Sequence, residues 1–279
     1  MNTAASFQRL IRGAALHPGV QIAVLLWLAD GALPFDRPAL ASMSFARQVA
    51  LPSLGMIEIF ALMAVVYFLT SRRAIPDIAA RAPIRAQAAR ETACLLVYAG
   101  LGQLGGWLAG PALGYRPFSF HIAGTVMGCA VPPSTGELST WAIYNFVVFA
   151  VVPWLWFRRR YSATRLNLRS TNRRNDLLVI VVVAAIESLV ELSAFPGILN
   201  LSANQLLIAA PLSFGVFMIG TVLPTMVLIY AILVPRYLRL TGSFATTVLL
   251  GGVTYASMHI MEGWSLFDTP LIARVFGVV

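Results

Sequence analysis

The chain has 279 residues, of which 58% are hydrophobic and only 11% are charged, and its mean hydropathy is +0.78. A soluble domain carries roughly 25% charged residues, so this composition excludes an ordinary water-soluble globule. The formal net charge is +9 and every basic residue is an arginine. Because the arginines stand in short runs between apolar stretches, we expect no nucleic-acid partner.

Several apolar stretches are long enough to predict about seven membrane-spanning helices. In chain order they cover residues 18–35, 49–70, 93–113, 138–157, 177–199, 205–235 and 244–261. The first has no convincing cleavage site after it and should remain in the protein as a span. The third is rich in glycine, which allows neighbouring helices to approach closely.

The sixth stretch is roughly 30 residues long, or about 45 Å as a helix. That length exceeds a hydrocarbon core of about 30 Å, yet two spans would have to turn inside the lipid. We therefore predict one long, tilted helix that bends near Pro211 or Pro224.

Two further segments do not read as spans. Residues 74–90 mix alanine, isoleucine and arginine and contain Pro76 and Pro83, which predicts an interrupted amphipathic segment at the membrane surface. Residues 116–133 are apolar but broken by glycines and prolines. They predict an extracytoplasmic or re-entrant loop.

The arginines indicate how the chain is oriented. Most of them precede the first predicted span or follow the second, fourth and sixth. Successive basic segments are thus separated by two spans and fall on one side of the membrane. The fold class we predict is an all-α, polytopic transmembrane bundle in a bacterial inner membrane, with its N-terminus in the cytoplasm.

Ionisable groups within the predicted spans are the candidate site residues, since burying them in lipid is costly. Glu187 and Glu191 are four residues apart and share a helix face, as do His259 and Glu262, three apart. If they converge, the carboxylates could activate water while the imidazole polarises a carbonyl group. The same acids would also suit proton transfer, or simple hydrogen bonding to neighbouring helices.

Other polar residues are expected to have structural roles. Glu58 is predicted to be a packing or boundary residue, and His17 and His121 to lie at the solvent or the interface. Too few histidines are present to favour a metal site. The sequence has no glycine-rich phosphate loop, nucleophile elbow or His-Glu-x-x-His motif, so we predict no cofactor.

Three segments of the C-terminal half form a recognisable series: Tyr144–Leu168 (YNFVVFAVVPWLWFRRRYSATRLNL), Leu223–Leu240 (LPTMVLIYAILVPRYLRL) and Tyr255–His259 (YASMH). In their order and spacing they resemble the CAAX-protease and bacteriocin-processing (CPBP) family of intramembrane proteases. The first resembles the helix and basic turn that open the family core, the second its first motif helix, and the third its aromatic-to-histidine motif. The resemblance divides the chain into N-terminal transmembrane helices, residues 1–134, and a CPBP-like core, residues 135–279.

The chain departs from the family where its catalytic acids would stand. When Pro235-Arg236 is aligned, the two glutamate positions fall on Thr225 and Met226, and the arginine position on Tyr230. No later histidine follows His259. The resemblance therefore implies a degenerate member that lacks ordinary peptidase machinery.

Three functions remain open on these grounds. The favoured one is binding of a membrane partner, peptide or lipid, with surrounding membrane lipids as further partners. The second is an atypical intramembrane hydrolase with Glu187 or Glu191 as base and His259 as electrophile. The third is a small transporter that uses the same acids for protons or ions.

Overall fold

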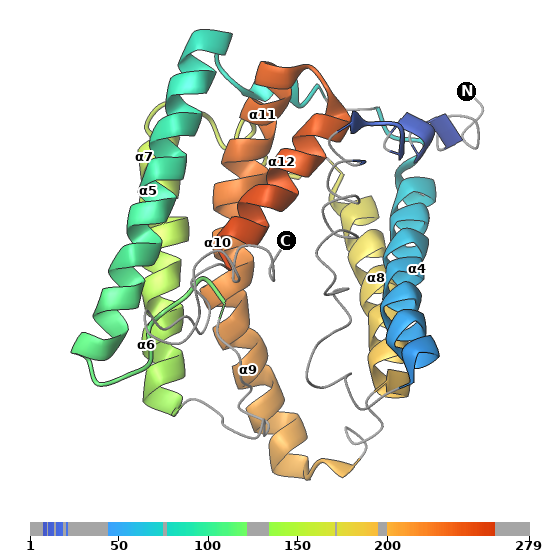
Figure 1. Ribbon diagram of the computed structural model, residues 1–279, viewed down its shortest axis with the longest axis vertical. Helices are drawn as coiled ribbons and strands as arrows, with labels where there is room; N and C mark the ends of the chain where they lie inside the picture. Colours follow the sequence, from blue (N-terminus) through green and yellow to red (C-terminus); the bar gives the residue numbers. More distant parts are fainter. Residues whose placement is uncertain are drawn as a thin grey trace. The chain divides into compact units, whose positions relative to one another are not determined.

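The computed structural model describes residues 8–9, 11–13, 15–18, 21, 44–74, 77–121, 134–170, 172–194 and 200–259. These residues form helices, turns and irregular segments, with no strand among them (Figure 1). The chain divides into two units, which we describe separately: the first is Met1–Pro76 with Ser170–Asn200, and the second is Asp77–Arg169 with Leu201–Val279. The predicted boundary at residues 134/135 rests on the family resemblance and stays a prediction. The predicted first span, residues 18–35, lies almost wholly outside the described residues.

Among the described residues of the first unit, two long helices pack together. Helix α4 (Phe45–Thr70) and helix α8 (Arg173–Ala194) lie side by side. The Asn175 side-chain amide donates a hydrogen bond to the Leu69 carbonyl at 3.2 Å, and Arg73 forms an ion pair with Asp176 at 2.7 Å. Both helices begin about four residues before their predicted spans, because polar residues at a helix end cost little where water is within reach.

In the described part of the second unit, four longer helical stretches pack together. They are α5 (Arg85–Ala112), the helix Thr135–Arg158, the helix Gln205–Thr241 and α12 (Phe244–Ser257). The first three are long and apolar enough to cross a membrane. Within the second, α6 (Thr135–Asn145) and α7 (Val152–Arg158) flank a π-helical segment. Within the third, α9 (Ala210–Phe217), α10 (Leu223–Thr225) and α11 (Val234–Thr241) are likewise joined by π-helical segments.

The prediction of one long helix is confirmed, since residues 205–241 form a single stretch of 37 residues. In this helix and in the helix 135–158, four prolines have the same local structure before them. The π-helical segments 146–151, 205–209, 218–222 and 226–233 each end two residues before a proline, at positions 153, 211, 224 and 235. A proline ring clashes with the carbonyl four residues earlier, and the wider π turn moves that carbonyl away. The helix therefore continues past each proline.

The segment 74–90 differs from its prediction. Only Ala79–Arg81 forms a short 3₁₀ turn (η1), and α5 has already begun at Arg85. Ala82 and Ala88 are buried, and η1 packs against α11. These two alanines were predicted to lie on a surface segment, but they pack between α5, η1 and α11. The described residues from Ala79 onward therefore belong to the helix bundle.

Candidate functional site

An extended segment, residues 116–121, runs back into the second unit after α5 ends. Gly114, at φ +79°, makes the turn, and Phe118, Ser119 and Phe120 are all at most 4% exposed. The Phe118 amide donates to the Gly106 carbonyl at 3.0 Å. An added Cβ on Gly106 would lie 2.7 Å from the Phe118 oxygen, so only glycine admits this backbone. The glycine-rich helix was predicted to allow close packing of neighbouring helices, whereas at Gly106 the close neighbour is this extended segment.

Helix α6 satisfies the buried carbonyls of this segment. Trp141 Nε1 donates to the Ser119 carbonyl at 2.8 Å, and Asn145 Nδ2 lies 2.9 Å from the Phe120 carbonyl and 3.0 Å from that of Gly220. Non-helical backbone at membrane depth persists only where protein or trapped water provides such partners. Asn145 therefore ties the extended segment to the long helix. The rest of the predicted re-entrant loop, residues 122–133, lies outside the described residues.

Two histidines meet where the extended segment reaches the end of α12. The ring centres of His121 and His259 lie 5.8 Å apart with 27° between their planes. Aromatic side chains surround them: Tyr255 and Phe120 lie 4.6 Å and 6.2 Å from His259, and Phe217 lies 6.3 Å from His121. We call these five residues the histidine site.

The tautomer of His259 follows from its hydrogen bond. Its Nδ1 lies 2.8 Å from the Tyr255 carbonyl, which can only accept, so Nδ1 carries the proton. In the neutral ring Nε2 is then an acceptor. Both histidines are half-buried, which leaves the site polar enough to bind a hydrogen-bonding group in an aromatic setting.

The predicted site residues are only partly accounted for. His259 belongs to the histidine site, whereas Glu187 lies half-buried on α8 of the first unit. Glu191 is also on α8, but its side chain lies outside the described residues, as does the whole of Glu262. The convergence of these acids with His259 therefore stays a prediction. His121, expected at the solvent or the interface, is instead half-buried beside His259; only its place in the predicted re-entrant segment hinted at this.

A buried ion pair that the sequence did not predict joins α5 to α11 in the second unit. Arg236 and Glu91 are 1% and 4% exposed, and Arg236 Nε and Nη2 donate to Glu91 Oε2 at 2.9 and 2.7 Å. Glu91 Oε1 accepts from Tyr161 Oη at 2.7 Å and Gln87 Nε2 at 2.9 Å. The remaining Arg236 group, Nη1, donates to the Ile232 carbonyl at 2.7 Å. We call these residues the Glu91 network.

Aromatic rings complete the Glu91 network. The Arg236 guanidinium carbon lies 4.6 Å from the Phe157 ring centre and 5.1 Å from that of Tyr161, within cation–π range. Burial, and then the hydrogen bond to the Glu91 carboxylate, raises the pKa of Tyr161 above its usual value. Both oxygens of the Glu91 carboxylate therefore accept hydrogen bonds from other side chains. This arrangement is typical of a structural anchor and not of a reactive base.

A second buried carboxylate is also paired. Glu137, in the first turn of α6, is 7% exposed, and its Oε1 lies 2.6 Å from Arg116 Nε. Its amide donates to the Ser134 side chain, which caps the helix. Among the described residues no three His, Cys, Asp or Glu side chains gather as metal ligands would.

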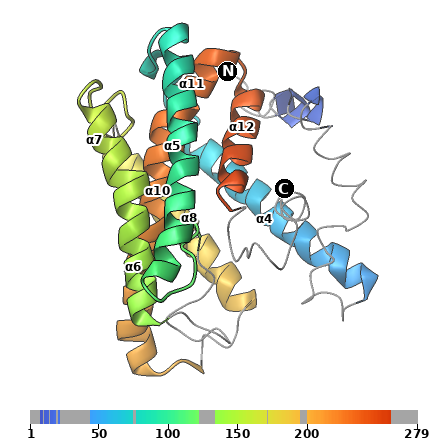
Figure 2. The ribbon, with the colours of Figure 1, turned by 60° about the vertical axis from the view of Figure 1, so that its left-hand side comes forward.

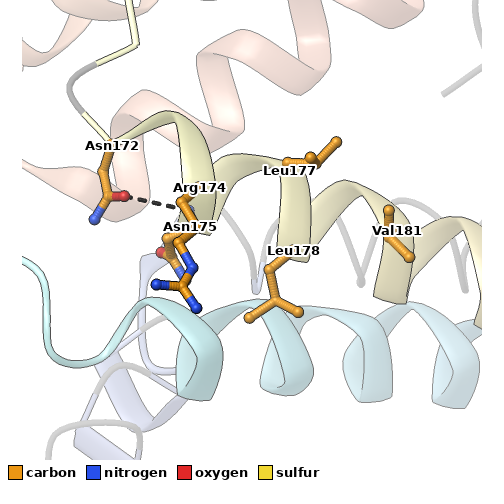
Figure 3. Close-up of a pocket in the computed structure, with 6 residues that line it drawn as sticks. All are labelled: Asn172, Arg174, Asn175, Leu177, Leu178 and Val181. Carbon is orange, nitrogen blue, oxygen red and sulfur yellow. Dashed lines mark hydrogen bonds between the residues drawn. The ribbon is translucent and has the colours of Figure 1, made fainter.

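The first unit contains a shallow recess at the start of α8 (Figure 3). It is lined by Asn172, Arg174, Asn175, Leu177, Leu178 and Val181. Asn172 Oδ1 accepts from the Asn175 amide at 3.2 Å and thus caps the helix. The polar groups here serve helix capping and packing on α4, and the lining holds no acid or nucleophile.

Comparison with known proteins adds no relative. No family model, curated protein or solved structure matches the chain. The family resemblance therefore stays a prediction.

Proposed function

We propose that the chain is a seven-span bacterial inner-membrane protein of CPBP-like fold, with its N-terminus in the cytoplasm. It lacks ordinary peptidase chemistry and binds a membrane partner, a peptide segment or a lipid, at the histidine site. Three helices long and apolar enough to cross a membrane support the location, and the arginine runs support the orientation.

One observation carries this proposal: both buried carboxylates in the described part of the second unit are neutralised by arginines. Glu91 is paired with Arg236 and Glu137 with Arg116. A general base must be within hydrogen-bond reach of the reacting water and retain an acceptor for its proton. Both carboxylates are held in ion pairs with arginines, which favours a structural role for them over general-base catalysis.

The positions where the family has its acids support the same conclusion. Met226 and Tyr230 are 50% and 55% exposed, so both face away from the core of the second unit. Thr225 is half-buried, and its hydroxyl oxygen has no hydrogen-bond partner within the described ranges. A threonine, a methionine and a tyrosine cannot replace two water-activating carboxylates and an arginine.

The histidine site offers the chemistry of a binding site. Helix α12 has 14 residues, a length of about 21 Å, which is shorter than a hydrocarbon core of roughly 30 Å. His259 follows its end and meets the extended segment, as helix ends and unwound backbone do in membrane binding sites. The aromatic rings suit an apolar chain, while His259 Nε2 accepts a hydrogen bond from an amide or hydroxyl group of the partner.

Photo-crosslinking in native membranes tests this proposal. A photoreactive amino acid at Tyr255, in the histidine site, should give one defined adduct, whereas the same group at Leu207, which is 76% exposed, should give only lipid adducts. His259→Ala should remove the defined adduct. An adduct that persists in His259→Ala would contradict binding at this site. Loss of a cleavage reaction in that variant would favour the hydrolase instead.

A further inference from the structure

The turn that follows α7 carries an unusual concentration of positive charge. Residues 158–169 include five arginines and no acid. All five are exposed, and they are Arg158, Arg159, Arg160, Arg165 and Arg169. Like charges this close repel one another, so the turn needs either a flexible backbone or a compensating partner.

This turn has a defined backbone. Tyr161 and Leu166 are 6% and 2% exposed and belong to the hydrophobic core. The Leu168 amide donates to the Ala163 carbonyl at 2.9 Å, and Asn167 adopts a left-handed conformation at φ 53°. Two buried anchors and a closed turn thus give the backbone that carries these exposed arginines a defined conformation.

Other elements add arginines at the same end of the second unit. Arg85 and Arg90, on the first turns of α5, are exposed, as is Arg239 on α11. Figure 2 shows the start of α5, the end of α11 and the turn after α7 at one end of the bundle. Of the acids here, Glu91 is buried against Arg236 and lies 3.9 Å from Arg160, and Asp77 accepts from the Ala80 backbone amide at 3.0 Å. We call the five turn arginines with Arg85, Arg90 and Arg239 the arginine surface.

We propose that the arginine surface binds the phosphate groups of anionic lipids. A guanidinium group matches phosphate oxygens with two parallel hydrogen bonds, which a lysine ammonium cannot do. The surface lies at the ends of apolar helices, where headgroups are within reach, and on the proposed cytoplasmic side, whose leaflet is anionic. The positive-inside rule depends only on how many arginines a cytoplasmic loop carries. This turn also has a defined backbone, which the rule does not require.

The test compares two triple variants of the full chain, purified in a zwitterionic detergent and titrated with phosphatidylglycerol. The first replaces Arg159, Arg165 and Arg169 by Gln; the control replaces Arg72, Arg173 and Arg174, exposed arginines of the first unit, by Gln. At about 1 kcal/mol for each arginine, the first should bind on the order of 100-fold more weakly. The control should change by less than about 3-fold. Equal losses would overturn the proposal, because only net charge would then matter.

Two further titrations separate guanidinium geometry from charge, and lipid from soluble phosphates. Lysine at the same three turn positions preserves charge and orientation, and should weaken binding by roughly 3- to 10-fold because the paired hydrogen bonds are lost. Unchanged affinity in that variant would refute recognition by guanidinium groups. Inorganic phosphate and a short RNA serve as competitors at physiological salt. If either displaced phosphatidylglycerol at an equal concentration, a lipid headgroup would not be the preferred ligand.

Discussion

The second unit contains two polar regions of opposite character. In the Glu91 network a carboxylate and a guanidinium group are almost fully buried and form hydrogen bonds to each other. Neighbouring groups accept or donate the remaining hydrogen bonds. In the histidine site two imidazoles are half-buried among aromatic rings. The comparison teaches that this bundle uses buried charge for structure, because an unpaired charge would be too costly there. The imidazoles of the histidine site lie instead against aromatic rings, where a ligand could meet polar and apolar groups together.

The largest effect is expected when the Glu91 network is broken on one side. Arg236→Leu leaves the Glu91 carboxylate buried without its cation, which should cost about 3–5 kcal/mol of unfolding free energy. The measurement is reversible unfolding in mixed micelles. The double variant Glu91→Leu with Arg236→Leu should recover most of the loss. If Arg236→Leu were as stable as the wild type, the anchoring role would be wrong.

Removal of the Asn145 amide should have the next largest effect. Asn145→Ala leaves buried carbonyls of the extended segment with fewer donors, at a cost of about 1–3 kcal/mol. It should also weaken adduct formation at Tyr255, because His121 is carried by that segment. Asn204→Ala, at an exposed position, is the control and should change neither quantity. If Asn145→Ala were destabilised but still gave the normal adduct at Tyr255, the extended segment would not be needed to form the histidine site.

Loss of the Tyr161 hydroxyl should have an effect of comparable size, with a pH dependence of its own. Tyr161→Phe removes a hydrogen bond to a carboxylate, about 1.5–3 kcal/mol. Since the pKa of Tyr161 is raised in the folded protein, its stabilisation is complete below its unfolded pKa of about 10 and is lost as the pH rises through the folded pKa. Above a pH of about 10, the unfolding free energy of the wild type should therefore fall more steeply than that of Tyr161→Phe. Parallel profiles would contradict this assignment.

The smallest effect is expected at the surface pair of the first unit. A hydrogen bond from Ser170 and then one from Arg73 lower the pKa of Asp176. Its stabilisation is present above the unfolded pKa of about 3.9 and is lost as the pH falls through the lower folded pKa. Solvent screens this pair, so Asp176→Asn should cost less than about 1 kcal/mol at neutral pH. A cost as large as that of Arg236→Leu would remove the contrast between buried and exposed pairs.

Local sequence features predicted much of the fold. Apolar length indicated the described helices, and the length of residues 205–241 indicated one helix and not two. The Glu91 network was missed because Glu91 lies just before the predicted third span, beside Arg90, and so resembles a boundary residue. Its partner Arg236 is 145 positions away in the chain. No local period records such a pairing, since tertiary packing selects it.

The candidate site was predictable only in part, for a similar reason. His259 was found from its place in an apolar stretch and in the YASMH segment. His121 could not be matched with it, because the depth of residues 116–121 depends on donors from α6 and on the space left by Gly106. A histidine in a glycine-rich loop looks like a solvent group until the backbone that carries it is known to be buried.

The most direct test of the binding site compares two variants in the Tyr255 photo-crosslinking assay. His121→Ala alters the partner of His259 that the fold places beside it, and Glu187→Gln alters an acid that the sequence alone would choose. We predict that His121→Ala removes the defined adduct and that Glu187→Gln leaves it intact. An adduct that survives His121→Ala but disappears in Glu187→Gln would contradict binding at the histidine site.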